Sequence, residues 1–222
     1  MKSLKRLIAS ALIFVIALTF CACDFGPKQY EASDLAYFEF TAIKGGYEVS
    51  AKNVNNLPEK LNIPETYNGS SVVKIAENGF EGANIKDLVI PSSIKTIGAN
   101  AFASSTLESV YFFTGVEVID NAAFYGCKSL GALNLPRSLQ SLGQSTFASC
   151  TSISAVVITE RVTTIGDACF AYCITLERVY IPRSVHTLGE SVFVGCSENI
   201  EFEISASNDH YKLDANGYPV AK

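Results

Sequence analysis

The stretch LERVYIPRSVHTLGESVFVGC, residues 176–196, repeats the pattern of two stretches that precede it. These are ISAVVITERVTTIGDACFAYC at residues 153–173 and LGALNLPRSLQSLGQSTFASC at residues 130–150. Each copy begins at an apolar residue and ends on a cysteine, and equivalent positions recur every 23 residues. A fixed period of this size is the signature of repeat proteins, in which stacked units bury a core that one unit cannot bury alone. The sequence therefore predicts a solenoid.

Six phenylalanines extend the repeat toward the N-terminus. Their spacings are 22, 22, 23, 23 and 23 residues, and an Ile or Leu stands five residues before each of them. Because stacking brings equivalent positions of successive units together, we expect these side chains to form one interior row. The row comprises Phe80, Phe102, Phe124, Phe147, Phe170 and Phe193.

Each unit also contains two apolar residues that flank a position of variable residue type, as in Val179-Tyr180-Ile181. Side chains alternate across a strand, so the outer two point inward and the middle one outward. The segment that holds each phenylalanine is too short for a long helix. The predicted fold is therefore a solenoid of about six coils, with short parallel strands on one face and short turns or 3₁₀ segments on the other. We predict strands at residues 88–90, 110–112, 133–135, 156–158, 179–181 and 202–204.

The stretches IPRSV (181–185) and LGESVFVGC (188–196), with their copies, resemble a known family pattern. It is the IP-x-x-V-x-x-IG-x-x-AF-x-x-C repeat of bacterial BspA-like leucine-rich repeat proteins. The resemblance covers about residues 61–196 and implies a solenoid with parallel strands on one face, together with adhesion or recognition of host proteins and matrix. The first two units depart from it, since Ala83 and Ser105 stand near the cysteine position and each unit is one residue shorter.

Residues 1–22 have the features of a secretory signal peptide. Three basic residues precede an apolar run of 14 residues, Leu7–Phe20, which is short for a membrane span. A cysteine directly after such a run resembles the bacterial lipoprotein signal, in which that cysteine carries the lipid. We favour lipidation of Cys23, which follows the small Ala22, over lipidation of Cys21. Cleavage without lipidation and an uncleaved anchor are the alternatives.

The rest of the chain divides by pattern. After a polar tether at residues 23–36, alternation around Lys44-Gly45-Gly46 predicts a β-hairpin, so residues 37–60 are expected to cap the stack. Residues 61–204 form the predicted solenoid, and the turn-rich residues 205–222 form an irregular C-terminal cap. These expectations describe an exported protein, anchored by lipid on a bacterial cell surface.

Composition argues against several classes of function. The formal net charge is −5 and no basic cluster occurs, which disfavours nucleic acid as a partner. The only histidines, His186 and His210, lie in different units and suggest no catalytic triad. We therefore predict no catalytic residue, no metal, no cofactor and no enzymatic activity.

One cysteine per unit forms a predicted column. The cysteines are whole coils apart, which does not fit the short pairs of a zinc site. We favour buried free thiols acting as small apolar residues, although disulfides stay open for an exported protein. The column consists of Cys127, Cys150, Cys173 and Cys196.

The outward positions of the strands form the candidate binding face. Apolar and aromatic side chains on a solenoid face are typical of a recognition surface for a protein or matrix ligand. Alternatively, Val and Tyr there satisfy strand propensity alone. A glycan- or nutrient-capturing protein, with Tyr111 and Tyr180 as stacking platforms, and a structural envelope protein without a ligand are the other hypotheses. The candidate binding residues are Val89, Tyr111, Phe113, Asn134, Val157, Arg178 and Tyr180.

Overall fold

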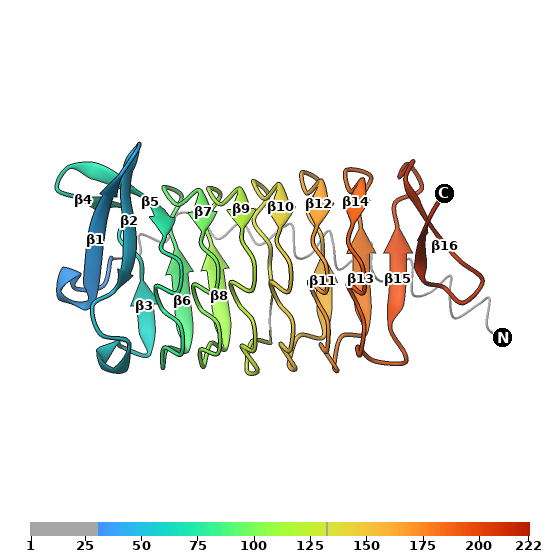
Figure 1. Ribbon diagram of the computed structural model, residues 1–222, viewed down its shortest axis with the longest axis horizontal. Coiled ribbons are helices and arrows are strands. Elements are labelled where there is room, and N and C mark those ends of the chain that lie inside the picture. The colour runs from blue at the N-terminus through green and yellow to red at the C-terminus, as the bar shows by residue number, and fades with distance from the viewer. Residues whose placement is uncertain (1–30, 132) are drawn as a thin grey trace.

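The computed structural model describes residues 31–131 and 133–222. The predictions for the signal peptide and for Cys21 and Cys23 therefore lie outside the described residues. The described chain winds into a single row of coils with a cap at each end (Figure 1). The predicted parallel-strand solenoid is confirmed, with about seven turns and almost no helix.

One face of the solenoid, here called the strand face, carries the longer strands. They form two separate parallel sheets, β3-β6-β8 and β11-β13-β15. Within the described residues, no ladder joins the first sheet to the second. The strands are β3 (Lys60–Asn62), β6 (Asp87–Ile90), β8 (Ser109–Phe112), β11 (Ala155–Val157), β13 (Arg178–Ile181) and β15 (Glu201–Ile204).

The strand predicted at residues 133–135 is wrong, because the segment forms no strand and separates the two sheets. The repeat changes length here. The first inward residue of the strand follows the anchor phenylalanine by eight residues in the Phe102 coil (Val110) and by nine in the Phe124 coil (Leu133). The extra residue lies in the turn before residues 133–135, so the corresponding turn of the preceding coil is one residue shorter, whereas that of the following coil has the same length. Leu133 and Leu135 are nevertheless buried.

The opposite face carries one continuous sheet in the order β1-β2-β5-β7-β9-β10-β12-β14, with β4 paired to β5. Two-residue parallel strands occur in the coils where the sequence pattern indicated only turns. This sheet crosses the point at which the strand face is interrupted (Figure 1). Its strands are β1 (Phe38–Ile43), β2 (Gly46–Ala51), β4 (Thr66–Tyr67), β5 (Ser70–Ile75), β7 (Thr96–Ile97), β9 (Val118–Ile119), β10 (Ser141–Leu142), β12 (Thr164–Ile165) and β14 (Thr187–Leu188).

The anchor phenylalanines form the predicted interior row. Successive rings are stacked, with centroid distances of 5.2 Å between Phe80 and Phe102 and 5.9 Å between Phe170 and Phe193 at the two ends. Five of the six rings are fully buried, and Phe193 is partly buried at the last coil. Main-chain bonds join the same turns, as in Phe147, whose N–H donates to the Cys169 carbonyl at 2.8 Å. The turns hold the coils together without forming 3₁₀ helices.

Each phenylalanine turn uses left-handed backbone twice, two residues before and two residues after the anchor. Glycine accepts this conformation readily and other residues adopt it at a cost. The position after the anchor is glycine in three coils (Gly82, Gly126 and Gly195) and Ser104, Ser149 or Tyr172 in the others. The position before it is never glycine.

The two ends are closed differently. The predicted hairpin is present as β1 and β2, and the 3₁₀ segments η1 (Leu35–Tyr37) and η2 (Val54–Asn56) flank it. At the far end, β16 (Tyr211–Leu213) and β17 (Pro219–Ala221) form an antiparallel pair where an irregular cap was expected. The Tyr211 hydroxyl accepts a hydrogen bond at 2.8 Å from the N–H of Leu188 in the last strand of the continuous sheet.

Residues 31–131 and 133–222 contain no helix long and apolar enough to cross a membrane.

Candidate functional site

The strand register places the predicted binding residues in two groups. Val89 lies between Asn62 and Tyr111 in the first sheet. Val157 lies beside Tyr180 in the second sheet, and Tyr180 lies beside Glu203. The segment that contains Asn134 separates the groups, so the predicted column is not one continuous ladder.

Exposure differs sharply along this column. Tyr111 is 51% exposed and Asn134 is also exposed, whereas Val157 and Tyr180 are half-buried. Val89 is only 3% exposed, so the expectation that it would be a surface contact is wrong. It does not belong to the core cluster. Its short side chain lies in the outer layer between the longer side chains of the neighbouring strands, which shield it because strands are only about 4.8 Å apart.

Two further predicted residues flank the column. Phe113 directly follows β8, at a position where three of the other coils have proline, and its N–H donates to the Ile90 carbonyl at 2.9 Å. Arg178 is half-buried in β13 and lies beside the exposed Glu201 of β15. The arrangement thus brings Tyr111 and Phe113 to one sheet and Val157, Arg178 and Tyr180 to the other.

The C-terminal part of the strand face is acidic. The Tyr180 hydroxyl donates to Glu160 Oε1 at 3.3 Å. Burial raises the pKa of Tyr180 and the nearby Glu160 carboxylate raises it further, so the phenol stays protonated as a hydrogen-bond donor. Burial also raises the pKa of Glu203, whose Oε2 is buried without a hydrogen-bond partner in the described structure. Tyr180, Glu160 and Glu203 can thus donate and accept hydrogen bonds.

All four cysteines of the column are free thiols; Cys127, Cys150 and Cys173 are buried, and Cys196 is partly buried. Each thiol donates to the carbonyl of the phenylalanine in the preceding coil, at 3.1 Å from Cys127 to Phe102 and 3.2 Å from Cys173 to Phe147. Burial raises the pKa of Cys127 to about 11 and that of Cys173 to about 12. Because the thiolate is the reactive form, these cysteines are poor nucleophiles at neutral pH.

The two histidines come together at the C-terminal end, with ring centroids 5.8 Å apart. Both are exposed, and His186 Nδ1 is hydrogen-bonded to the Thr187 hydroxyl at 3.2 Å. In the described part of the chain, no three His, Cys, Asp or Glu side chains gather into a group that could hold a metal ion.

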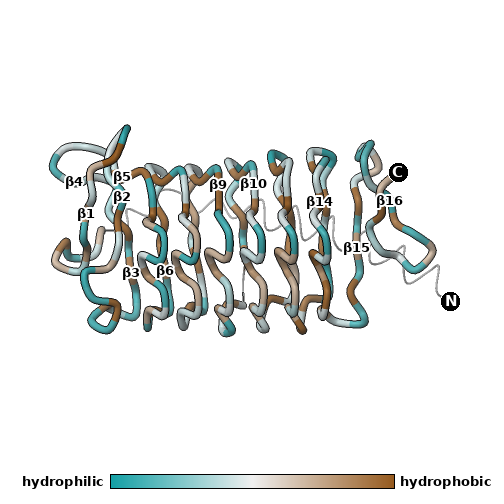
Figure 2. The backbone as a smooth tube through the Cα atoms, viewed as in Figure 1, coloured by the Kyte–Doolittle hydropathy of each residue, from teal (hydrophilic) through white to brown (hydrophobic). Residues whose placement is uncertain are grey.

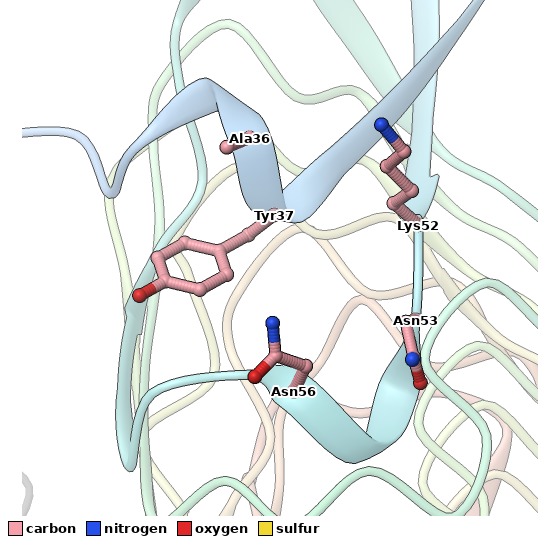
Figure 3. Close-up of a pocket in the computed structure, with 5 residues that line it drawn as sticks. All are labelled: Ala36, Tyr37, Lys52, Asn53 and Asn56. Atoms are coloured by element: carbon pink, nitrogen blue, oxygen red, sulfur yellow. The ribbon is translucent and has the colours of Figure 1, made fainter.

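A small hollow of about 440 Å³ lies at the N-terminal cap, lined by Ala36, Tyr37, Lys52, Asn53 and Asn56 (Figure 3). η1, the two residues between β2 and η2, and η2 itself supply these residues. The Lys52 N–H donates to the Tyr37 carbonyl at 2.9 Å, which fixes the two sides of the hollow. The ion pairs of the described residues join other lysines, so the Lys52 ammonium has no carboxylate partner there. Amide and ammonium donors suit a small hydroxylated or anionic ligand.

Sequence reasoning missed a second set of exposed apolar residues, located in the phenylalanine turns. Tyr125, Tyr172, Ile174 and Val194 are each between 44% and 59% exposed. The signal was present in the sequence, because aligning the coils on their anchor phenylalanines shows large apolar residues where other coils carry small or polar ones.

The profile of the BspA type leucine-rich repeat region matches residues 59–208 in six copies. No curated protein matches the chain.

Several solved structures are similar. A leucine-rich repeat protein from T. pallidum shares 29% identity with a TM-score of 0.73, over 79% of this chain and 82% of that one. A leucine-rich repeat protein from Bacteroides ovatus shares 33% identity with a TM-score of 0.67, over 82% of this chain but 48% of its own. The pneumococcal vaccine antigen PcpA, at 22% identity and a TM-score of 0.70 over 86% of this chain and 53% of its own, has the same fold.

Proposed function

The chain belongs to the BspA type leucine-rich repeat family, and on this basis we propose that it is a non-catalytic cell-surface module that binds a protein or matrix ligand through its strand face. Repeat solenoids present extended surfaces of this kind to their partners. No enzyme family matches the sequence.

The observation that carries the proposal is the exposure of Tyr111. An aromatic ring that is 51% exposed on β8, the edge strand of the first sheet, gains much from a partner that covers it. Phe113, directly after the same strand, and the exposed Asn134 in the next coil extend the surface beyond the ring. Tyrosines of this kind are enriched among residues that dominate binding energy.

The second sheet supplies a different chemistry. Tyr180 donates to Glu160, and Arg178 lies beside Glu201, so this part of the face offers charged and hydrogen-bonding groups. Strand spacing gives the whole face a length of about 30 Å, which suits a protein surface of standard size. Tyr111 and Phe113 would act as the apolar anchor. The charged groups of the second sheet would favour ligands of complementary charge.

The proposed location is the outer surface of a bacterial cell. The apolar run Leu7–Phe20 followed by Cys23 supports export and a lipid anchor at that cysteine. Growing cells with an alkyne-labelled fatty acid should label the chain, and Cys23→Ser should abolish that label while Cys21→Ser leaves it. Equal labelling of both variants would exclude the anchor at Cys23.

A glycan- or nutrient-capturing surface protein is the second candidate. Tyr111 offers an exposed ring on which a sugar can stack, and the hollow at Tyr37, Lys52 and Asn56 offers donors for hydroxyl or carboxylate groups. A structural envelope protein without a ligand is the third candidate.

Probing protein and glycan arrays with the full chain separates these candidates. Protein ligands that lose affinity on Tyr111→Ala and Tyr180→Ala would support the strand face, with Tyr125→Ala as the matched control on a phenylalanine turn. A binding affinity that neither tyrosine substitution changes would overturn the strand-face proposal. Exclusive binding of glycans would favour the second candidate, and no binding at all the third.

A further inference from the structure

Three exposed apolar side chains cluster on the phenylalanine turns of two adjacent coils near the C-terminal end. Tyr172 is 57% exposed, Ile174 59% and Val194 46%. The Tyr172 N–H donates to the Val194 carbonyl at 2.7 Å, so the two residues are direct neighbours. The Tyr172 ring also lies over Gly195, where a methyl group would collide with it. We call this set, Tyr172, Ile174 and Val194, the Tyr172 patch.

The position of Tyr172 is one that the fold normally gives to small residues. Its backbone is left-handed, with a φ of 59°, and a bulky side chain in this conformation is strained. The fold does not require a tyrosine here, since glycine or serine occupies this position in the other coils. The equivalent residues of the other five coils are Gly82, Ser104, Gly126, Ser149 and Gly195.

Ile174 is a second exception in the same coil. It stands four residues after the anchor Phe170 and is more exposed than any other large apolar residue of the described chain. Every other coil has a polar residue four positions after its anchor, namely Asn84, Thr106, Lys128, Thr151 and Ser197. Two large apolar replacements in one turn, each exposed, are better explained by contact with a partner than by packing. Hydrophobic residues recur from coil to coil along the whole row (Figure 2), so it is the exposure of the side chains that distinguishes this turn.

The surroundings of the patch are acidic. The two stretches that form it, residues 167–177 and 190–201, contain five acidic residues and no Lys, Arg or His, and the next residue, Arg178, lies beside Glu201 on the strand face. Glu177 and Glu201 lie on neighbouring coils, where the Glu201 N–H donates to the Glu177 carbonyl at 2.7 Å. The ion pairs of the described residues involve none of these carboxylates. The five, all exposed, are Asp167, Glu177, Glu190, Glu198 and Glu201.

We propose that the Tyr172 patch is a second docking surface, separate from the strand face, that receives a basic segment of a partner protein carrying an apolar or aromatic side chain. The apolar side chain would cover Tyr172 and Ile174, and its lysines or arginines would pair with the acidic rim. A second copy of this chain fits less well, because its net charge of −5 would repel the rim. The inference does not depend on the strand-face proposal, since the apolar residues are different and only Glu201 of the rim also lies on the strand face.

Phage display tests the proposal. Random 12-residue peptides are panned on the full chain, and those that also bind the Tyr172→Ser/Ile174→Ser variant are removed. We expect the surviving peptides to carry net positive charge and at least one apolar residue. A synthetic copy of the best peptide should bind the double variant about tenfold or more weakly by calorimetry. Tyr125→Ser, an exposed tyrosine on another phenylalanine turn, is the matched control and should bind normally.

Two further variants separate the contributions. Glu177→Gln/Glu198→Gln should lower the affinity for the peptide and make that affinity less dependent on salt concentration, because the charge pairs are removed. Tyr111→Ala should leave the peptide affinity unchanged, which distinguishes this surface from the strand face. Melting curves of each variant establish that it is folded. The proposal is overturned if no peptide depends on Tyr172 and Ile174, or if those that do are neutral or acidic.

Discussion

The thiol of Cys150 donates a hydrogen bond to the main-chain carbonyl of Phe124, one coil earlier, at 3.1 Å. The same carbonyl accepts the N–H of Cys127 at 3.2 Å within its own coil. The thiol therefore uses the second lone pair of a buried carbonyl and links two coils by a side chain as well as by the backbone. Cys127, Cys173 and Cys196 repeat the bond.

Substitutions of Cys150 test whether its thiol stabilises the fold through the hydrogen bond or only by filling space in the core. Cys150→Ala removes the donor and leaves a small void, and should lower the free energy of unfolding by about 1–2 kcal/mol. Cys150→Ser keeps a donor and should cost less, since the buried Ser105 already occupies the equivalent position in an earlier coil. Urea unfolding followed by circular dichroism measures both. A serine variant less stable than the alanine variant would show that the thiol acts only as an apolar filler.

The raised pKa values of the thiols predict how stability depends on pH. Burial raises the pKa of Cys127 to about 11 and that of Cys169 to about 12, against about 8.5 for an unfolded cysteine. Between these values the unfolded chain loses protons that the native chain keeps, so stability is full below pH 8.5 and falls as the pH rises toward 11. Urea midpoints measured at pH 7 to 10.5 should decrease accordingly, and less so in Cys127→Ser. A midpoint independent of pH would contradict the buried protonated thiols.

The interior row of phenylalanines predicts a large effect for Phe147→Ala. The ring is fully buried, with its neighbours Phe124 and Phe170 at centroid distances of 5.3 and 5.5 Å. Loss of burial and the resulting cavity should cost about 3–5 kcal/mol. Tyr125→Ala, which removes an exposed ring, should cost less than about 1 kcal/mol. A loss below about 1 kcal/mol for Phe147→Ala itself would mean that neighbouring coils can close around the missing ring.

Much of this fold was predictable because its signals repeat. Phenylalanines 22 or 23 residues apart identify the coils, and alternation around Tyr111 and Tyr180 identifies most strands of the strand face. The two-residue strands of the other face, such as Thr96–Ile97, were missed because pairs that short have no local alternation. They exist through bonds to neighbouring coils, which a pattern within one unit does not contain.

The strand predicted at residues 133–135 and the exposure predicted for Val89 failed for a related reason. Leu133-Asn134-Leu135 alternates correctly, but a strand also needs both neighbouring coils in register, and the change of repeat length falls there. Outward direction was correctly inferred for Val89, yet its exposure depends on the side chains of the adjacent strands. The Tyr172 patch was not predicted, because the phenylalanine turns were expected to point their side chains into the core.

The left-handed positions of the phenylalanine turns predict a stabilising substitution. Ala168 has a φ of 52°, where a Cβ costs about 1–2 kcal/mol. Glycine removes that cost but adds about 0.4–1 kcal/mol of chain entropy to the unfolded state, so Ala168→Gly should stabilise the protein slightly. Ala148→Gly, at a position with ordinary backbone and a buried methyl group, should destabilise it. Thermal unfolding of the two variants should give melting shifts of opposite sign, and shifts of the same sign would refute the account.

The C-terminal cap depends on one buried amide. Asn208 is fully buried, and its Nδ2 donates to the carbonyls of Pro182 at 2.8 Å and Val185 at 3.2 Å. Its Oδ1 accepts the N–H groups of His210 and Tyr211, at 2.9 and 2.8 Å. One side chain thus joins the last coil to the start of the capping hairpin.

Asn208→Ala should therefore detach the cap from the last coil. Four hydrogen bonds are lost and buried main-chain groups are left unpaired, each at a cost of about 1–3 kcal/mol when water cannot replace the partner. Asn208→Asp keeps the two accepted hydrogen bonds and loses both donated ones. Comparing it with Asn208→Ala therefore separates the contribution of the donated bonds from that of the accepted bonds. Hydrogen exchange should accelerate first at Leu188, whose N–H is held by the Tyr211 hydroxyl, and remain slow at Phe124. Equal acceleration at both sites would mean that the cap and the central coils unfold as one unit.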